Sequence, residues 1–149
     1  MSMSQSYANR ILNAAFGISD TVTASSKLYL GLCSAAPNAS TGAVTSEPSA
    51  ASYARQICGG TGADDVTQSF ASATGGVIKN IKEIRMNTAR QAWGTMNYWF
   101  ISESATGAAI IWGELKNAET GESGVTIPEK TVPVFFENEL KASIDVELT

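Results

Sequence analysis

Histidine is absent from the 149 residues of this chain. Without it, the chain has no Ser-His-Asp or Cys-His arrangement to activate a nucleophile, and no imidazole to bind a metal or titrate near neutral pH. Most hydrolase templates are excluded on this ground alone. We therefore expect no enzyme activity, no cofactor and no metal centre.

Carboxylate pairs remain as a route to glycoside cleavage, which requires two acidic groups facing each other in a cleft. Asp64 and Asp65 are adjacent in a glycine-rich stretch, where aspartate favours turn geometry. Glu103 follows a predicted strand and Glu114 lies in one, as solvated charges do. We interpret all four as structural or solvent-facing residues.

Positive charge is sparse: ten lysines and arginines are scattered from Arg10 to Lys141, and the net charge is −4. Neutralising phosphates requires a clustered basic face, so nucleic acid is not an expected partner. The chain also lacks an apolar run of about 18 residues, and residues 1–6 lack the features of a signal peptide. We expect a protein made in the cytoplasm of its host and not inserted in a membrane.

Charged residues of both signs make up only 16% of the chain, and small neutral residues fill much of the rest. This is less solvating charge than a free domain usually carries. A small, neutral surface suits close approach of another protein, but loops rich in small residues would also produce it.

Cysteine is limited to Cys33 and Cys58, which have no CxxC spacing and each end a predicted strand. Small buried thiols are ordinary at such positions, and we favour packing over a disulfide or a reactive thiol. A chain of this length buries a sizeable core without disulfides.

Alternation of apolar and polar residues dominates what is present. Residues 140–148 alternate without exception, which is the period of a half-buried β-strand. The predicted strands cover residues 28–33, 53–58, 77–86, 95–101, 109–115, 125–127, 132–136 and 140–148. Their spacing predicts an all-β fold, an antiparallel β-sandwich or jelly roll with one N-terminal α-helix. We expect a single domain over residues 1–149.

One segment shows a convincing helical period. It predicts a helix over residues 7–16, capped by Ser6 and ended by Gly17 in the left-handed conformation. Its apolar stripe consists of Tyr7, Ile11, Leu12, Ala15 and Phe16. Residues 1–17 thus form an N-terminal arm and helix.

Residues 34–52 form a long loop that contains Pro37 and Pro48. Because it is too long for a hairpin, we expect it to join strands that need not be neighbours, or to reach out to another molecule.

The predicted strand at residues 95–101 is apolar on both sides. This pattern is typical of a strand in the middle of a sandwich whose second face is covered. We favour the N-terminal helix as the cover, because its apolar stripe needs a surface. A neighbouring subunit is the alternative.

Several short motifs together resemble a known family. They are Leu28-Tyr-Leu-Gly-Leu32 with Ala36-Pro37, Glu47-Pro48 with Ser52-Tyr-Ala-Arg55, Ala92-Trp-Gly-Thr95, and Ile111-Trp-Gly-Glu-Leu115. The pattern resembles a family of small virion proteins of tailed phages and prophages, often labelled phage tail fibre proteins. Its motifs are structural, so the resemblance implies a virion structural protein and no active-site residues.

Small β-sandwich proteins serve in phages as fibre attachments, baseplate parts and capsid decoration or cement proteins. Because the chain has no heptads or fibrous repeats, we favour decoration, in which the protein binds the capsid lattice and stabilises it. A tail fibre or baseplate-associated role is the alternative. The expected partners are the major capsid protein or tail components, and further copies of this chain, so we expect a homo-oligomer located on the virion.

Candidate contact residues lie on the helix and around the long loop. They are Tyr7, Arg10, Pro37, Glu47, Pro48, Tyr53 and Arg55. A purely structural interpretation also fits, with Tyr7 in the core, the prolines as loop stiffeners and Arg55 as a solvated strand residue. In the alternative role, Trp93, Trp99 and Trp112 would form an exposed platform that binds a host glycan by stacking.

Overall fold

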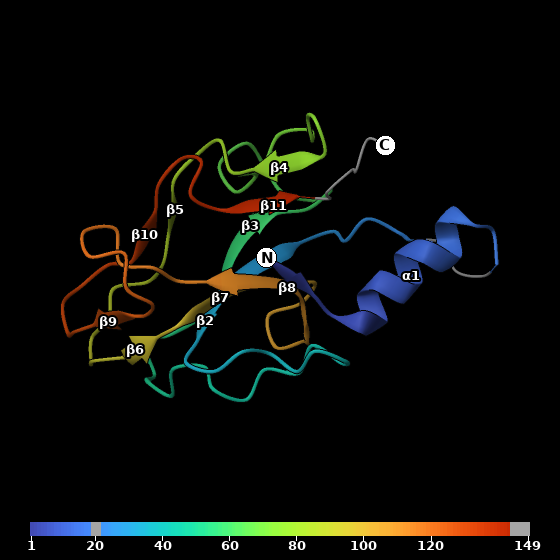
Figure 1. Ribbon diagram of the computed structural model, residues 1–149. Helices are drawn as coiled ribbons and strands as arrows, with labels where there is room; N and C mark the ends of the chain where they lie inside the picture. The colour runs from blue at the N-terminus through green and yellow to red at the C-terminus, as the bar shows by residue number, and fades with distance from the viewer. Residues whose placement is uncertain (19–21, 144–149) are drawn as a thin grey trace.

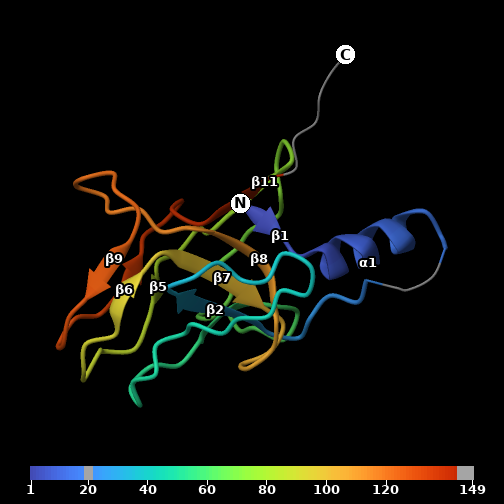
Figure 2. The same ribbon diagram turned by 60° about the horizontal axis from the view of Figure 1, so that its bottom comes forward.

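The computed structural model describes residues 1–18 and 22–143. Its centre is a five-stranded antiparallel sheet with the strand order β1-β8-β7-β2-β3 (Figure 1). These strands are β1 (Ser2–Met3), β2 (Leu28–Cys33), β3 (Gln56–Gly59), β7 (Tyr98–Ser102) and β8 (Ala109–Glu114). The helix α1 (Gln5–Ala15) follows β1 and projects from one end of the sheet (Figures 1 and 2).

Two-stranded antiparallel sheets pack against the central sheet. They are β4 (Val77–Lys79) with β11 (Lys141–Ser143), β5 (Ile84–Arg85) with β10 (Val134–Phe135), and β6 (Gly94–Met96) with β9 (Val125–Ile127). The predicted all-β antiparallel fold with one N-terminal helix is therefore confirmed. Part of the strand predicted over residues 140–148 is present as β11, and residues 144–148 of this prediction lie outside the described residues.

Two long predicted strands are each divided by an asparagine. The buried Asn80 separates β4 from β5, because its amide donates to the carbonyls of Lys82 and Phe136 and accepts from the Leu140 N–H. Asn97 separates β6 from β7, and its side chain donates to the carbonyl of Ser34. The alternation of apolar and polar residues predicted one continuous strand in each place. Alternation carries no information on side chains that bond to the backbone and so interrupt the hydrogen bonds between strands.

Both faces of the central strand β7 are buried, as the sequence pattern indicated. On one face, Trp99 and Ile101 pack with Leu30 and Leu32 against residues of the small sheets. On the other face, Phe100 packs with Trp112.

The predicted cover for the Phe100 face is wrong. None of the α1 residues is buried, so the helix does not lie on the sheet. The loop of residues 34–52 covers this face instead: Val44 packs against the Phe100 cluster, and the Ala109 N–H donates to the carbonyl of Gly42. The short edge strand β1 directs α1 away from the end of the sheet. The Phe100 face is therefore open to the long loop, which covers it.

The same loop does not join distant strands. It connects β2 to β3, which are adjacent in the sheet. The sequence left open whether these strands are neighbours, and the structure shows that they are. The extra length of the loop lets it fold back over β7 and β8.

Both cysteines are buried and unpaired, in agreement with the packing interpretation. No helix in the described part of the chain is long and apolar enough to cross a bilayer.

Candidate interaction surface

The base of α1 is firmly attached to the body of the protein. β1 pairs with β8, and the backbone N–H groups of Ser4, Gln5 and Ser6 donate to carbonyls of Ile110 and of the long loop. Ser4 caps the helix through its side chain, which accepts from the Tyr7 N–H at 3.4 Å. The predicted cap was Ser6, so the helix begins earlier than predicted. Gly17 has the predicted left-handed conformation, with φ of +64°.

One ion pair holds the first half of the helix. Arg10 Nη1 lies 2.8 Å from Glu103 Oε2, and the Ser25 hydroxyl donates to Glu103 Oε1 at 2.6 Å. The guanidinium also lies over the Tyr7 ring. Partial burial raises the pKa of Glu103, but the bonds from Arg10 and Ser25 and the Arg10 charge outweigh it, so the net shift is downward. Burial and the Glu103 charge raise the pKa of Tyr7. The predicted contact residues Tyr7 and Arg10 therefore lie together and anchor the helix.

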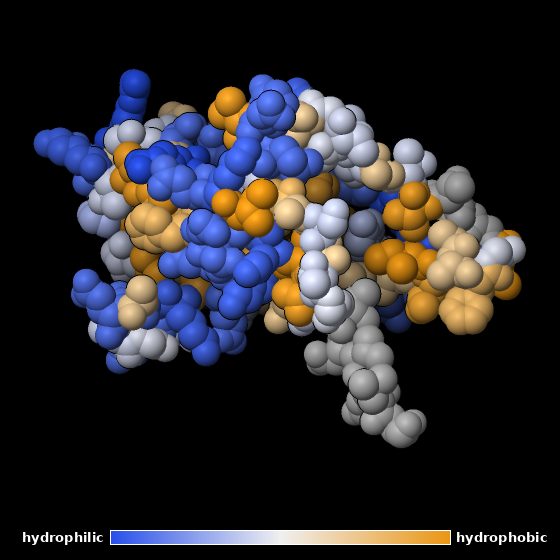
Figure 3. All heavy atoms as spheres, turned by 90° about the horizontal axis from the view of Figure 1, so that it is seen from above, coloured by the Kyte–Doolittle hydropathy of each residue, from blue (hydrophilic) through white to orange (hydrophobic). Residues whose placement is uncertain are grey.

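Exposed apolar side chains gather at the C-terminal end of the helix and just after it. Leu12 is 54% exposed and Phe16 is 76% exposed, and Ile18 follows at the same end. Figure 3 shows apolar atoms gathered over this projecting end of the molecule. Leu12 and Phe16 are four residues apart, so they lie on one side of the helix. We call this pair the α1 tip.

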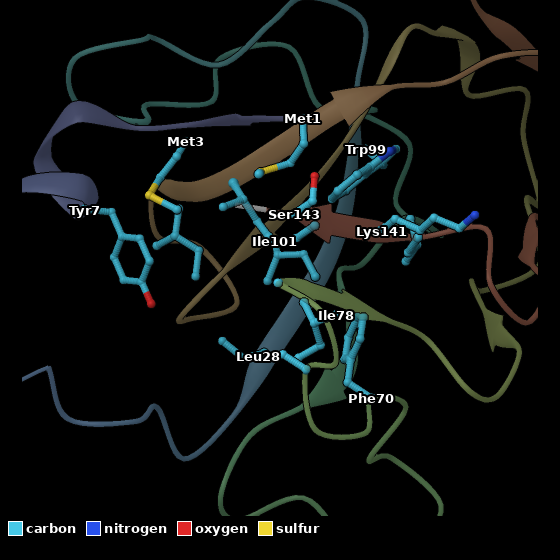
Figure 4. Close-up of a pocket in the computed structure, with 16 residues that line it drawn as sticks. Met1, Met3, Tyr7, Leu28, Phe70, Ile78, Trp99, Ile101, Lys141 and Ser143 are labelled. Carbon is cyan, nitrogen blue, oxygen red and sulfur yellow. The ribbon is translucent and has the colours of Figure 1, made fainter. Parts of the chain in front are cut away.

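An apolar cavity of about 310 Å³ opens at the base of the same helix. Figure 4 shows Met3 and Tyr7 on one side of it and Ile78 and Phe70 on another, with Ile101 of β7 between them. Further lining comes from Leu28, Ala73, Ile110, Ile111, Leu140 and Ala142. We call this hollow the β1 cavity.

The candidate residues of the long loop form an internal network. Arg55 makes a bidentate ion pair with Glu47, and its Nη1 donates to the Ser102 hydroxyl and to the carbonyls of Ser104 and Gly107. The Tyr53 hydroxyl donates to Glu47 at 2.8 Å. Burial is the main reason why the pKa of Tyr53 is raised.

This network corrects part of the predicted contact set. Arg55 is buried, and so are Pro37 and Pro48. The Arg55 side chain fastens the loop to the sheet, and none of the three residues presents an exposed contact surface. Glu47 and Tyr53 are half-buried and are engaged with Arg55 and with the backbone of Leu32.

The three tryptophans do not form an exposed platform. Trp93, Trp99 and Trp112 are all buried, and Trp112 lies in a different core cluster from the other two. Trp93 meets Tyr53 edge-to-face at 5.2 Å and donates to the Ser52 hydroxyl. The prediction that these rings form a glycan-binding platform is wrong, because all three are packed in the two core clusters.

Two of the carboxylates considered for catalysis, Asp64 and Glu103, have structural partners. Asp64 accepts hydrogen bonds from the backbone and hydroxyl of Thr67 and from the Val66 N–H, which lower its pKa and shape a turn. Glu103 is paired with Arg10. Within residues 1–18 and 22–143, no three His, Cys, Asp or Glu side chains gather in a way that suits a metal ion.

Sequence reasoning missed both apolar features at the end of the molecule. The stripe on α1 was visible, but its periodicity predicts only an apolar face and does not say what covers that face. The β1 cavity leaves no local signal, because its lining comes from segments spread along the whole chain.

Comparison with known proteins adds the family. A family model described as Podophage GP4 fiber I protein gp80 matches residues 2–132. No curated protein matches the chain. The match covers the five-stranded sheet, the helix, the long loop and the β6–β9 sheet. The chain therefore belongs to the family of the podophage fibre I protein gp80, and it is a phage virion structural protein.

Proposed function

We propose that this protein is a non-enzymatic subunit of the phage fibre apparatus, made in the host cytoplasm and built into the particle by protein–protein contacts. The exposed α1 tip carries the proposal. A helix whose base is bonded to the body and whose end presents Leu12 and Phe16 to solvent is suited to docking on another protein.

The family description supports a fibre location, because the matching model is that of a podophage fibre protein. The absence of histidine and the structural use of Asp64 and Glu103 support a non-enzymatic role. The low charge of the chain also suits a surface that is covered in an assembly.

Capsid decoration is the second candidate. It is favoured by the lack of fibrous repeats or heptads, which a long shaft would require. In that role the protein would bridge neighbouring capsomers and add interface area to the shell.

Immunogold electron microscopy of intact particles, with antibodies against this chain, tests the location. We expect gold at the tail or its fibres. Gold spread over the shell would replace the fibre proposal with decoration. Mass spectrometry of the same purified particles is the control for presence, and particles without the chain would overturn both candidates.

A further inference from the structure

A hollow with an apolar floor lies at the end of the molecule opposite α1, beside β9 and β10 (Figures 1 and 2). We call it the β10 hollow, and its volume is about 730 Å³. A cavity of about 150 Å³ accommodates benzene, so the hollow has room for more than one side chain of a bound segment. Its floor consists of residues that form the larger core cluster or pack against it, namely Leu32, Trp99, Val125, Ile127, Phe135 and Leu140.

Phe136 lines the β10 hollow and is 60% exposed. The neighbouring Pro133 and Val134 are half-buried and line the hollow with it. Ser143, after which the chain is not described, lines the β1 cavity and not this hollow. An exposed aromatic ring beside an apolar floor is typical of the centre of a protein–protein contact.

The rim of the β10 hollow is negatively charged. Three exposed glutamates line it, Glu114, Glu119 and Glu139. Among the described residues that line the hollow, Lys116 is the one base, so the rim has a net charge of −2. The Glu139 carboxylate also accepts a hydrogen bond from the Phe136 N–H, which holds this negative charge beside the exposed ring.

The segment around the hollow carries the charge of the whole chain. Residues 114–139 contain six glutamates and two lysines, and their net charge of −4 equals that of the full sequence. The ion pairs found within residues 1–18 and 22–143 all lie outside this segment. In the same described ranges, no three carboxylates gather in a way that suits a metal ion. The complementary charge is therefore a spread one, such as that of a peptide with several basic side chains.

We propose that the β10 hollow binds a segment of another protein of the particle, one that presents an aliphatic or aromatic side chain between lysines or arginines. The apolar side chain packs on the floor beside Phe136, and the basic groups pair with Glu114 and Glu119 at the rim. Burial of the apolar anchor supplies most of the affinity, and the complementary charge selects the segment. The contact rests on the proposed function and deepens it, because it defines the chemistry of the partner.

A second copy of this chain fits the hollow less well. Arg10, Arg55 and Arg85 each pair with a glutamate of their own chain. Lys82 donates to the carbonyl of Asp65. Because these cations are already engaged, we expect the basic side chains from a different protein.

A synthetic probe tests this chemistry in solution. The probe is a peptide with blocked ends and one phenylalanine between two pairs of lysines, titrated into the isotope-labelled full chain and followed by NMR. We expect binding with a Kd of about 1 mM or below, with shifts confined to residues that line the β10 hollow. Replacing the phenylalanine of the probe by serine, or its lysines by glutamates, should weaken binding about tenfold in each case.

Two charge reversals separate the rim from the general charge of the segment. Glu119 lines the hollow, whereas Glu129 is an exposed residue of the same segment that does not line it. Glu119→Lys and Glu129→Lys change the net charge equally. We expect Glu119→Lys to weaken binding of the probe about fivefold, and the control Glu129→Lys to change it less than about twofold. Circular dichroism confirms that both variants are folded.

Photo-cross-linking in intact particles identifies the partner. Benzoylphenylalanine is placed at position 136 and, in the control, at position 66, because Val66 is 84% exposed and does not line the hollow. We expect light to join position 136 to another virion protein, at a segment where mass spectrometry finds an apolar residue flanked by lysine or arginine. Position 66 should not give this product.

A probe that does not bind at about 10 mM, or equal losses with the two charge reversals, would overturn the proposal. A cross-link to a second copy would overturn it in favour of self-association, and so would a cross-link to a segment without basic residues in favour of another contact. Particles that contain the chain but give no product at position 136 would overturn this contact and leave the proposed function standing. Particles without the chain would overturn the proposed function, while binding of the probe would still support the chemistry of the hollow.

Discussion

Arg55 and Glu47 form a bidentate ion pair, with Nε–Oε1 at 2.9 Å and Nη2–Oε2 at 2.8 Å, although only 3% of the Arg55 side chain is exposed. The guanidinium also lies over the Phe100 ring, 4.7 Å from its centroid. One buried cation thus fastens the long loop, the start of β3 and the turn between β7 and β8 to the centre of the sheet.

Removing the carboxylate should be severely destabilising. Glu47→Ala leaves the Arg55 charge buried and without its ionic partner, and we expect a loss of about 3 kcal/mol in the free energy of unfolding. Urea denaturation measures this loss. Glu83→Ala is the matched control, because the Glu83–Arg85 pair is exposed and its loss should cost about 0.5 kcal/mol. Equal effects of the two substitutions would show that Arg55 finds other compensation.

The Gly31 position should tolerate no side chain. Gly31 lies opposite Phe100 in the β2–β7 ladder, and a Cβ there would overlap the fully buried phenyl ring. We expect Gly31→Ala to lower the free energy of unfolding by about 2 kcal/mol. In the double variant with Phe100→Leu, the cost of the alanine should fall, because the overlap is relieved. Strictly additive effects would place the strain elsewhere.

The pair that anchors α1 should weaken in acid. Hydrogen bonds from Arg10 and Ser25, together with the Arg10 charge, hold the folded-state pKa of Glu103 below its unfolded value of about 4.3. Its contribution to stability is therefore fully present above that unfolded value and is lost as the pH falls through the lower folded pKa. Unfolding of the wild type and of Glu103→Gln, followed from neutral pH into acid, measures the difference, which should be largest near neutrality and close to zero below the folded pKa. A difference that is constant with pH would contradict an ionic role.

Both thiols should be unreactive in the folded protein. Burial raises the pKa of Cys33 and of Cys58 to about 12, and the Glu47 charge adds to the shift at Cys33. Because the thiolate is the nucleophile, alkylation by iodoacetamide at pH 8 should require unfolding. The labelling rate, read by mass spectrometry, should therefore rise with urea in parallel with the unfolded fraction. Rapid labelling without denaturant would reveal local opening of β2 or β3.

Local sequence patterns predicted the helix and the strands better than they predicted which segments pack against them. The alternation in residues 28–33 and 125–127 matched β2 and β9, because both strands use an ordinary ladder. The helix was found to within two residues at its start, yet its stripe was assigned to the sheet. Which segment covers a face of the sheet depends on the direction in which the chain leaves the preceding strand. Here the edge strand β1 sets the direction of α1.

For the candidate site, too, the sequence predicted local positions better than packing partners. Tyr7 and Arg10 were predicted from their position on the helix, and they do lie together at its base. Arg55 was predicted as a contact residue, but its partners at Ser102, Ser104 and Gly107 are distant in sequence, so its burial had no local signature. Tryptophan content alone does not separate a core from a binding platform, and here the core used all three rings.

The strand order β1-β8-β7-β2-β3 has a consequence for synthesis on the ribosome. β1 and β2 emerge early, but they pair with β8 and β7, which are made much later. Until then β2 has only β3 to pair with, and its other edge stays open, which exposes the nascent chain to aggregation. Silent codons that slow translation between β3 and β7 should therefore lower the soluble yield without changing the folded product.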